Sequence, residues 1–396
     1  MGAAAGIISA LVPVVQGNIP LEAALSKAGP TRKKDAGPDL KGLDLLRLRA
    51  QPRRVTTPLP GGRTAELTLD PELQRAATSV MKKYRVPEAG AVLMDIKTGE
   101  LLVYASQIHE GEKFDVNVKA EAPAASIFKV ITGASLVENA NLNAKTEQCY
   151  HGGRSSITAG ELQEDPARDK WCATLAAAMG RSLNVVFGRL SQKHLTPEEL
   201  TATGGAFGFG QPVPFAVPTE ASQIAIPSEP LEFARTSAGF WNTTLSPLHG
   251  ASIAQTIANG GVTLEPRIVR SITKERETLW ESDGKPRVLR RAVKPETAKE
   301  VTKMMLQTVH NGSAYTQFHD KQGRPFIPKI HIAGKTGTLT NHKANRHYTW
   351  FVGFAPAEKP EVAVSVLVVN TPIWRIKGPM LAQEVLKAYF RKTGKI

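Results

Sequence analysis

The sequence is poor in the residues that would indicate a metal or cofactor protein. It contains two cysteines in 396 residues, and aromatic residues make up 6% of the chain. The two thiols lie far apart, and no His-Glu-x-x-His segment occurs, so the ligand spacing of a zinc site is missing. We therefore expect no metal and no cofactor. With 41% apolar residues, the chain can still bury a large core.

The sequence also lacks an apolar run long enough to cross a membrane comfortably. Residues 3–15 are apolar but are interrupted by Pro13, whereas a span needs about 20 residues. The run is similar to the apolar part of a secretion signal, although no basic residue precedes it. We predict an export or anchor segment at 1–16, with membrane association through it, and an extracytoplasmic location. The alternative is a buried N-terminal helix.

The chain has 50 lysine and arginine residues but only 36 aspartate and glutamate residues, which leaves a formal net charge of +14. Such a balance suits an anionic partner, for example a phospholipid surface or an acidic polymer. Nucleic acid is the rival explanation. However, the basic residues are scattered, with a local excess only within 32–54, and no nucleic-acid-binding signature occurs. We therefore expect no nucleic-acid partner.

The two cysteines, Cys149 and Cys172, leave two possibilities open. In an exported protein they would form a disulfide that closes a loop of modest size. Two reduced and buried thiols are the alternative.

The order of turn residues and apolar runs predicts an α+β fold. Residues 17–63 are rich in Pro, Gly and charge and suggest a linker, so we place the folded domain at 64–396. Within it Asp70 precedes Pro71 as a helix N-cap. The pattern predicts a hairpin over 89–105, helices within 120–259, strands at 330–338, 348–355 and 362–369, and a helix over 379–390. We expect an antiparallel sheet flanked by helices, with an all-α lobe and the active site between them.

A serine and a lysine lie one helical turn apart at the start of an apolar helix, in Ser126-Ile-Phe-Lys129. Serine is a weak nucleophile at neutral pH and needs a base. A lysine can act as that base if burial lowers its pKa, and the flanking residues are apolar. The same spacing occurs in Ser79 to Lys82, but in a charged helix end that favours a solvated pair.

Two further segments follow in fixed order. Ser182-Leu-Asn184 is the only Ser-x-Asn in the sequence, and in an extended or looped segment its two polar side chains point the same way. Lys335-Thr-Gly-Thr338 ends a β-like run. On an edge strand Gly337 would let another backbone approach, which suits a peptide substrate added as a further strand. A second Lys-Thr-Gly, at Lys97, fits the turn of the predicted hairpin.

The segments around these motifs resemble the transpeptidase domain of penicillin-binding proteins. The likeness involves 92–106, 126–132, 244–262, 334–338 and 351–356, and it extends from about residue 64 to the C-terminus. Several independent segments agree in order, with the Ser-x-x-Lys, Ser-x-Asn and Lys-Thr-Gly motifs among them.

The resemblance implies a D,D-transpeptidase that cross-links peptidoglycan stem peptides through an acyl-enzyme. It implies that Ser126 is the nucleophile and Lys129 its general base. Ser182 would relay a proton to the leaving amine with support from Lys335, while Asn184 would bind a substrate amide or orient Lys129. The substrate carboxylate would be held by Thr336 and Thr338, the oxyanion by the backbone amides of Ser126 and Thr338, and Gly337 would keep the strand open.

Stem peptides and β-lactams are the ligands that this resemblance implies, with a separate glycosyltransferase as a partner, since the residues before the domain are too few for another enzyme domain. A D,D-carboxypeptidase or β-lactamase would use the same residues with water as acceptor. The long stretch from Ser182 to Lys335, without a convincing glutamate to activate water, argues against a lactamase. A β-lactam sensor that keeps the site is a further alternative.

Overall fold

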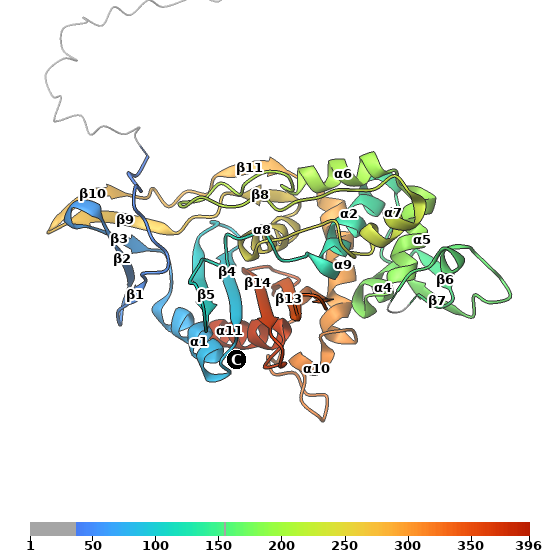
Figure 1. Cartoon of the computed structure of the whole chain (residues 1–396). Coiled ribbons are helices and arrows are strands. Elements are labelled where there is room, and N and C mark those ends of the chain that lie inside the picture. Colours follow the sequence, from blue (N-terminus) through green and yellow to red (C-terminus); the bar gives the residue numbers. More distant parts are fainter. Residues whose placement is uncertain (1–36, 154–155) are drawn as a thin grey trace, which may run out of the picture. The chain divides into compact units, whose positions relative to one another are not determined.

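The computed structural model describes residues 37–153 and 156–396 (Figure 1). The export or anchor segment predicted at 1–16 lies outside the described residues. From Leu40 to Ile396 the chain forms one compact unit. Within the described ranges no helix is both long and apolar enough to cross a membrane.

A five-stranded antiparallel sheet forms the centre of this unit. Its strand order is β12 (Ala333–Asn341), β13 (Arg346–Ala355), β14 (Val362–Asn370), β4 (Glu88–Asp95) and β5 (Leu101–Ile108). The predicted hairpin is confirmed as β4 and β5. The strand predicted at 330–338 begins three residues later, at Ala333, and forms one edge of the sheet.

Helices cover both faces of the central sheet. α1 (Pro71–Lys83) and α11 (Gly378–Lys392) pack on one face, and α8 (Pro247–Ala258) packs on the other (Figure 1). β14 supplies both cores, because its successive side chains point to opposite faces. Val364 and Val366 join the core under α1 and α11, whereas Leu367 and Val369 join the core under α8.

Most of the remaining helices form the predicted α-lobe beside the sheet, and the last of them, residues 315–318, packs against α11. They are the 3₁₀ turn η2 (Ala125–Phe128) with α2 (Lys129–Ala140), α3 (Ala159–Leu162), α4 (Leu175–Arg181), α5 (Asn184–His194), α6 (Pro197–Ala206), α7 (Pro230–Ser237), α9 (Pro295–His310) and α10 (Tyr315–Phe318). α2 packs against α5, α6 and α9. The α+β fold predicted from the sequence is therefore confirmed.

A second five-stranded sheet corrects the predicted linker at 17–63. Its strand order is β1 (Arg49–Ala50), β2 (Val55–Leu59), β3 (Arg63–Leu67), β9 (Val269–Lys274) and β10 (Glu277–Glu281), with the 3₁₀ turn η1 (Pro60–Gly62) between β2 and β3. Val55 and Leu59 are buried in the main core. Residues 40–63 thus belong to the folded unit, because β2 pairs with β3, and β3 in turn pairs with β9, some 200 residues away, which no local pattern reveals.

Two antiparallel two-stranded sheets complete the structure: β8 (Val262–Leu264) with β11 (Val288–Arg291), and the β6–β7 hairpin of β6 (Glu147–Tyr150) with β7 (Trp171–Thr174). Cys149 lies opposite Cys172 in the β6–β7 pair, and the two are joined by a disulfide. Of the two possibilities left open by the sequence, the structure contains the disulfide.

Candidate active site

Ser126 lies in η2, at the start of the helix that continues as α2. The preceding residue, Ala125, has a φ of +49°, in the left-handed region that non-glycine residues rarely adopt. The segment before it is held from two sides. The Trp350 indole donates to the Pro123 carbonyl at 2.9 Å, and the Ala124 amide donates to the Thr243 carbonyl at 3.1 Å. The backbone turn that presents Ser126 is therefore fixed by distant strands and loops.

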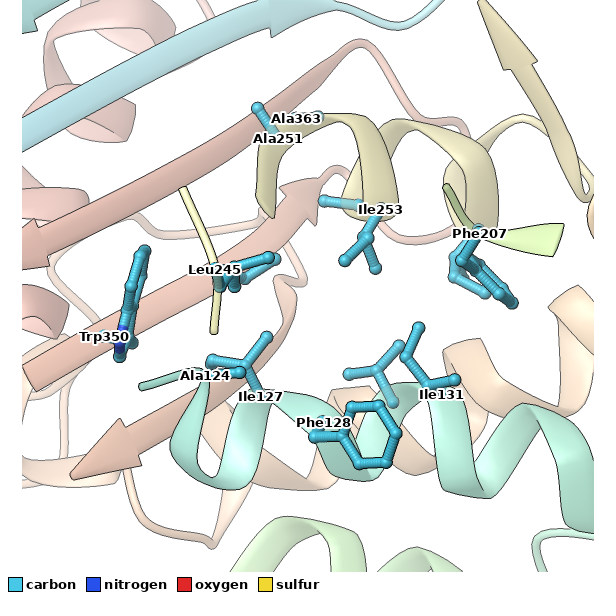
Figure 2. Close-up of a cluster of buried hydrophobic side chains, with 14 of the residues drawn as sticks. Ala124, Ile127, Phe128, Ile131, Phe207, Leu245, Ala251, Ile253, Trp350 and Ala363 are labelled. Carbon is cyan, nitrogen blue, oxygen red and sulfur yellow. The ribbon is translucent and has the colours of Figure 1, made fainter. Parts of the chain in front are cut away.

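Apolar packing anchors the same helix. Figure 2 shows Ile127, Phe128 and Ile131 from η2 and α2 in a cluster that also contains Leu245 and Ile253 near and on α8. All five side chains are buried. This packing follows from the apolar residues around Ser126 and leaves the serine itself partly accessible at the edge of the cluster.

Lys129 is fully buried and directed at Ser126. Its Nζ lies 2.9 Å from Ser126 Oγ and 2.8 Å from Asn184 Oδ1, and it also donates to the Ala238 carbonyl. Burial lowers the pKa of Lys129 well below its ordinary value, and the nearby Lys335 lowers it further. The buried surroundings therefore favour the neutral amine over the charged form.

The neutral form satisfies every neighbour of this amine. A neutral lysine has two N–H donors and one lone pair. The oxygens of Asn184 and Ala238 can only accept hydrogen bonds, so they take both donors. The lone pair then remains for the Ser126 hydroxyl, which is the arrangement that a general base requires.

Ser182 and Asn184 are presented by a sharp break between two helices. α4 ends at Arg181, Ser182 adopts a left-handed φ of +58°, and α5 begins at Asn184. The Leu183 amide closes the turn by donating to the Ala178 carbonyl at 2.9 Å. Ser182 accepts a hydrogen bond from Lys335 Nζ at 3.0 Å. The loop predicted for this motif is thus a helix–helix turn that sends the serine to one lysine and the asparagine to the other.

Lys335 projects from β12 and is also fully buried. Besides Ser182, its Nζ contacts the Thr336 carbonyl at 2.9 Å. Burial lowers the pKa of Lys335 to about 7. At neutral pH this group therefore exists in both protonation states.

Gly337 brings β12 close to the serine-bearing turn. A Cβ at this position would lie 3.2 Å from Ile127 Cγ1 and 3.3 Å from the Ala124 carbonyl oxygen. From the sequence we expected the space at Gly337 to admit another backbone. The backbone that approaches it belongs to this chain, between Ala124 and Ile127. Glycine is needed here so that strand and nucleophile can lie side by side.

Three contributors to the site were not predicted from the sequence. Ser313, between α9 and α10, lies with its Oγ 2.5 Å from Thr336 Oγ1, while Thr338 is exposed further along β12. Gly239 packs against the Ala125 carbonyl, where a Cβ would approach to 2.3 Å. The third is the Ala238 carbonyl. For Ser313 the only local signal in the sequence is the Asn311-Gly312 turn that precedes it. A backbone carbonyl acceptor cannot be predicted from residue type, because every residue has one.

The described residues show one group of potential metal ligands, formed by Glu147, Cys149 and Cys172. Both thiols are used in the disulfide, so this group offers no thiolate. The eight predicted site residues are instead gathered around two serine–lysine pairs. Ser126 pairs with Lys129, Ser182 pairs with Lys335, and Asn184, Thr336, Gly337 and Thr338 surround them.

Comparison with known proteins agrees with this geometry. The family model described as penicillin binding protein transpeptidase domain matches residues 89–391. The peptidoglycan D,D-transpeptidase PbpA of Mycobacterium tuberculosis is 29% identical over 353 residues, which cover 78% of this chain and 68% of that protein. Stage V sporulation protein D of Bacillus subtilis is 26% identical, over 79% of this chain and 51% of that protein.

Solved structures share the fold. The D,D-transpeptidase domain of a peptidoglycan glycosyltransferase from Eggerthella lenta is 26% identical with a TM-score of 0.68, covering 84% of each chain. The imipenem acyl-enzyme complex of penicillin-binding protein A from M. tuberculosis is 24% identical with a TM-score of 0.67, covering 82% of this chain and 79% of that one.

Proposed function

Since the chain belongs to the penicillin-binding protein transpeptidase domain family, we propose that it is a D,D-transpeptidase that cross-links peptidoglycan stem peptides. The observation that carries this proposal is the buried Lys129 amine, whose lone pair faces the Ser126 hydroxyl while Asn184 and Ala238 occupy its hydrogens. The same arrangement makes Ser126 the residue that β-lactams acylate.

In the first step, Ser126 Oγ attacks the carbonyl carbon of the penultimate D-Ala of a donor stem peptide. The hydroxyl proton passes to the lone pair of Lys129 Nζ as the C–O bond forms. The C–N bond to the terminal D-Ala breaks, and its nitrogen takes the Ser182 proton, which Lys335 replaces. An ester on Ser126 and free D-Ala result. A β-lactam would undergo the same attack, with opening of its ring in place of release.

The second step runs the same proton path in reverse. The amine of an acceptor stem peptide attacks the ester carbon, and a proton of that amine passes through Ser182 to Lys335. The C–N bond forms, the C–Oγ bond breaks, and Ser126 regains its proton from Lys129. The new peptide bond joins two stems, and both lysines return to their starting protonation states.

We assign binding of the donor stem peptide to residues of β12. We assign the substrate carboxylate to the hydroxyls of Thr336 and Thr338, with the cationic form of Lys335 nearby. The backbone amides of Ser126 and Thr338 are assigned to the oxyanion. Because β12 is an edge strand, a peptide can pair along it as an added strand.

The cellular setting belongs to the same proposal. A stem-peptide substrate and a disulfide both suit an extracytoplasmic location, where thiols are oxidised. We assign the domain to 64–396 together with the strands at 49–59, and we expect the segment at 1–16 to direct export or anchoring. A separate glycosyltransferase that supplies the glycan strands is the partner that we propose.

Acylation by penicillin tests the central assignment. Intact-mass spectrometry of the purified chain after treatment with penicillin G should show one adduct that decays slowly. Ser126→Ala should form no adduct, whereas Ser79→Ala, in the exposed Ser-x-x-Lys of α1, should react like the wild type. An adduct that persists in Ser126→Ala would remove Ser126 from the mechanism. Rapid turnover of nitrocefin would favour the β-lactamase alternative, and release of D-Ala without transfer to an amine would favour the carboxypeptidase.

A further inference from the structure

A groove of about 800 Å³ opens beside Ser182 and leads away from β12. It is lined by the β6–β7 hairpin on one side, by the α4–α5 turn at its inner end, and by the α9–α10 loop on the other side. The side chains that define its chemistry are those of Tyr150, Trp171, Arg181, Ser182, Asn311 and Ser313, together with Glu161, whose carboxylate accepts from the Gly153 and Thr158 amides. None of the roles assigned above uses the hairpin side of this groove.

The wall formed by the hairpin is built as a fixed structure. Its two strands are joined by the disulfide between Cys149 and Cys172. Behind it Arg189, with a side chain only 2% exposed, donates to the carbonyls of Cys149 and Glu161 at 2.9 and 2.8 Å and pairs with Asp169 at 2.8 Å. Because Arg189 belongs to α5, the wall is tied to the helix that begins at Asn184. Its position relative to the catalytic turn is therefore set before any ligand arrives.

The wall presents aromatic surface to the groove. Tyr150 and Trp171 lie opposite each other in the β6–β7 register, with ring centroids 6.2 Å apart. Trp171 is 59% exposed, the second highest fraction among the exposed large apolar residues of the described chain, tied with Ile373. Tryptophan left in water on a rigid support is the residue type that most often anchors a partner. A disulfide-fixed aromatic pair at the rim of a groove thus indicates a binding surface.

The place of Ser182 determines which substrate this surface meets. In the proposed reaction Ser182 protonates the departing D-Ala amine in the first step and deprotonates the acceptor amine in the second. Both nitrogens must therefore occupy the same position, beside Ser182. D-Ala is small and leaves after the first step. The acceptor is a whole stem peptide, so the protein needs space beside Ser182 for the rest of that peptide. The groove starts at Ser182 and provides that space.

We propose that this groove is the binding site of the acceptor stem peptide, with Trp171 as its main anchoring side chain. The inference rests on the transpeptidase function proposed above. Arg181 supports it by charge, because it is exposed and forms no ion pair among the described residues, and a stem peptide carries a free carboxylate. Trp171 is a specificity residue for the second step and does not contact the reacting atoms.

The test compares a peptide acceptor with a minimal one. The full chain would be acylated with diacetyl-L-Lys-D-Ala-D-Ala as donor, and transfer would be followed against acceptor concentration by mass spectrometry. One acceptor is a stem tripeptide with a free side-chain amine. The other is deuterium-labelled D-alanine, which reaches Ser182 but leaves the groove empty, and whose label distinguishes the transfer product from the donor by mass. Trp171→Ala should raise the half-saturating concentration of the tripeptide by about 5- to 30-fold and leave that of D-alanine unchanged.

Two variants serve as matched controls. Trp171→Phe keeps an aromatic face and should recover most of the tripeptide affinity. Leu279→Ala removes an exposed apolar side chain from β10, in the other five-stranded sheet, and should change neither acceptor. The rate of penicillin acylation reports in every variant whether the catalytic turn is intact.

The measurements distinguish failure of the groove assignment from failure of the proposed function. Equal saturation of wild type and Trp171→Ala by the tripeptide would overturn the groove assignment, as would a matching loss for D-alanine. A wild-type chain that forms no penicillin adduct, or that transfers to no amine at any concentration, would instead overturn the proposed function.

Discussion

Two Ser-x-x-Lys segments of this chain share their spacing and a helical backbone but lie in opposite environments. Ser79 and Lys82 are both exposed near the end of α1. Ser126 and Lys129 lie at the start of α2, where Lys129 is fully buried. The pKa of Lys129 is lowered by that burial, and its hydrogens are taken up by Asn184 and the Ala238 carbonyl.

The difference arises from segments far away in the sequence. Asn184 comes from α5 and Ala238 from the end of α7, so the α-lobe supplies the hydrogen-bond partners of Lys129. A serine and a lysine one turn apart supply only proximity. Removal of water and occupation of the lysine hydrogens supply the reactivity.

Two of the three Lys-Thr-Gly segments, at Lys97 and Lys335, likewise differ in their surroundings. At Lys97 the tripeptide closes the β4–β5 hairpin, where the Asp95 carboxylate accepts from the Lys97 and Thr98 amides and Gly99 has a φ of +73°. At Lys335 it lies within a strand, and Gly337 permits contact with the serine-bearing turn. Glycine serves backbone conformation in the first case and close packing in the second.

The largest expected effect separates the two lysines. Lys129→Ala should slow penicillin acylation by about 10²- to 10⁴-fold, the usual contribution of a general base. Lys82→Ala should leave the rate within about twofold, because its exposed side chain makes no contact with the site. Stopped-flow measurement of acylation checks both. Equal acylation rates for the two variants would contradict the conclusion that burial makes Lys129, but not Lys82, a base.

Replacement of Gly337 and of Gly99 by alanine should affect different properties, namely the acylation rate and the stability of the fold. Gly337→Ala should slow acylation by about 10- to 100-fold, because Cβ pushes β12 away from the turn that carries Ser126. Gly99→Ala should lower the free energy of unfolding by about 1–3 kcal/mol with little change in acylation of the folded protein, since its φ is positive and Cβ would lie 2.4 Å from the Glu265 carbonyl. Acylation rates and urea denaturation distinguish the two. Normal acylation by Gly337→Ala would show that close packing of β12 against the turn is not required.

Titration sharpens the contrast between the two buried lysines. Lys335 has a pKa of about 7, so its cationic form is dominant below that pH and is lost above it. Burial and the nearby Lys335 also lower the pKa of Lys129 and favour its neutral form, so we expect loss of the Lys335 cation to govern the pH dependence. The second-order acylation rate of the wild type should therefore fall by about fivefold from pH 7 to pH 8 and by about 50-fold from pH 7 to pH 9. A rate that rises steadily to pH 9, in protein whose circular dichroism is unchanged, would contradict a role for the cation.

The smallest expected effect concerns a residue outside the three motifs. Ser313→Ala removes the hydroxyl that contacts Thr336 at 2.5 Å and should reduce acylation by about five- to tenfold, the usual value of one hydrogen bond. Thr316→Ala, an exposed hydroxyl on α10, is the matched control and should have no effect. If both variants match the wild type, the motif residues position the substrate without help from the α9–α10 loop.

Local patterns were enough to predict the central sheet and most of the site residues. The apolar run of β14, the Asp70 cap of α1 and the turn at Gly99 are each determined by neighbouring residues. The order of the three motifs indicated that Ser126, Ser182 and Lys335 meet, and the structure brings them together.

Other features depend on contacts that a sequence does not record. The carbonyl of Ala238 and the left-handed backbone at Ala125 belong to main-chain geometry, which any residue type can provide. Ser313 meets Thr336 only because α9 packs beside β12. The strands at 49–59 looked like a linker because they are short, and because the sheet that they extend through β3 is completed only by β9, about 200 residues later.

That long-range pairing determines when the protein can assemble. β3 has no neighbour on one side until β9 has been synthesised, and β4 has none on one side until β14 is complete. Loop-closure entropy delays such contacts during folding. The nucleophile thus emerges early, while β12 with Lys335 emerges only in the last fifth of the chain. A growing polypeptide therefore carries the serine well before it carries a reactive site.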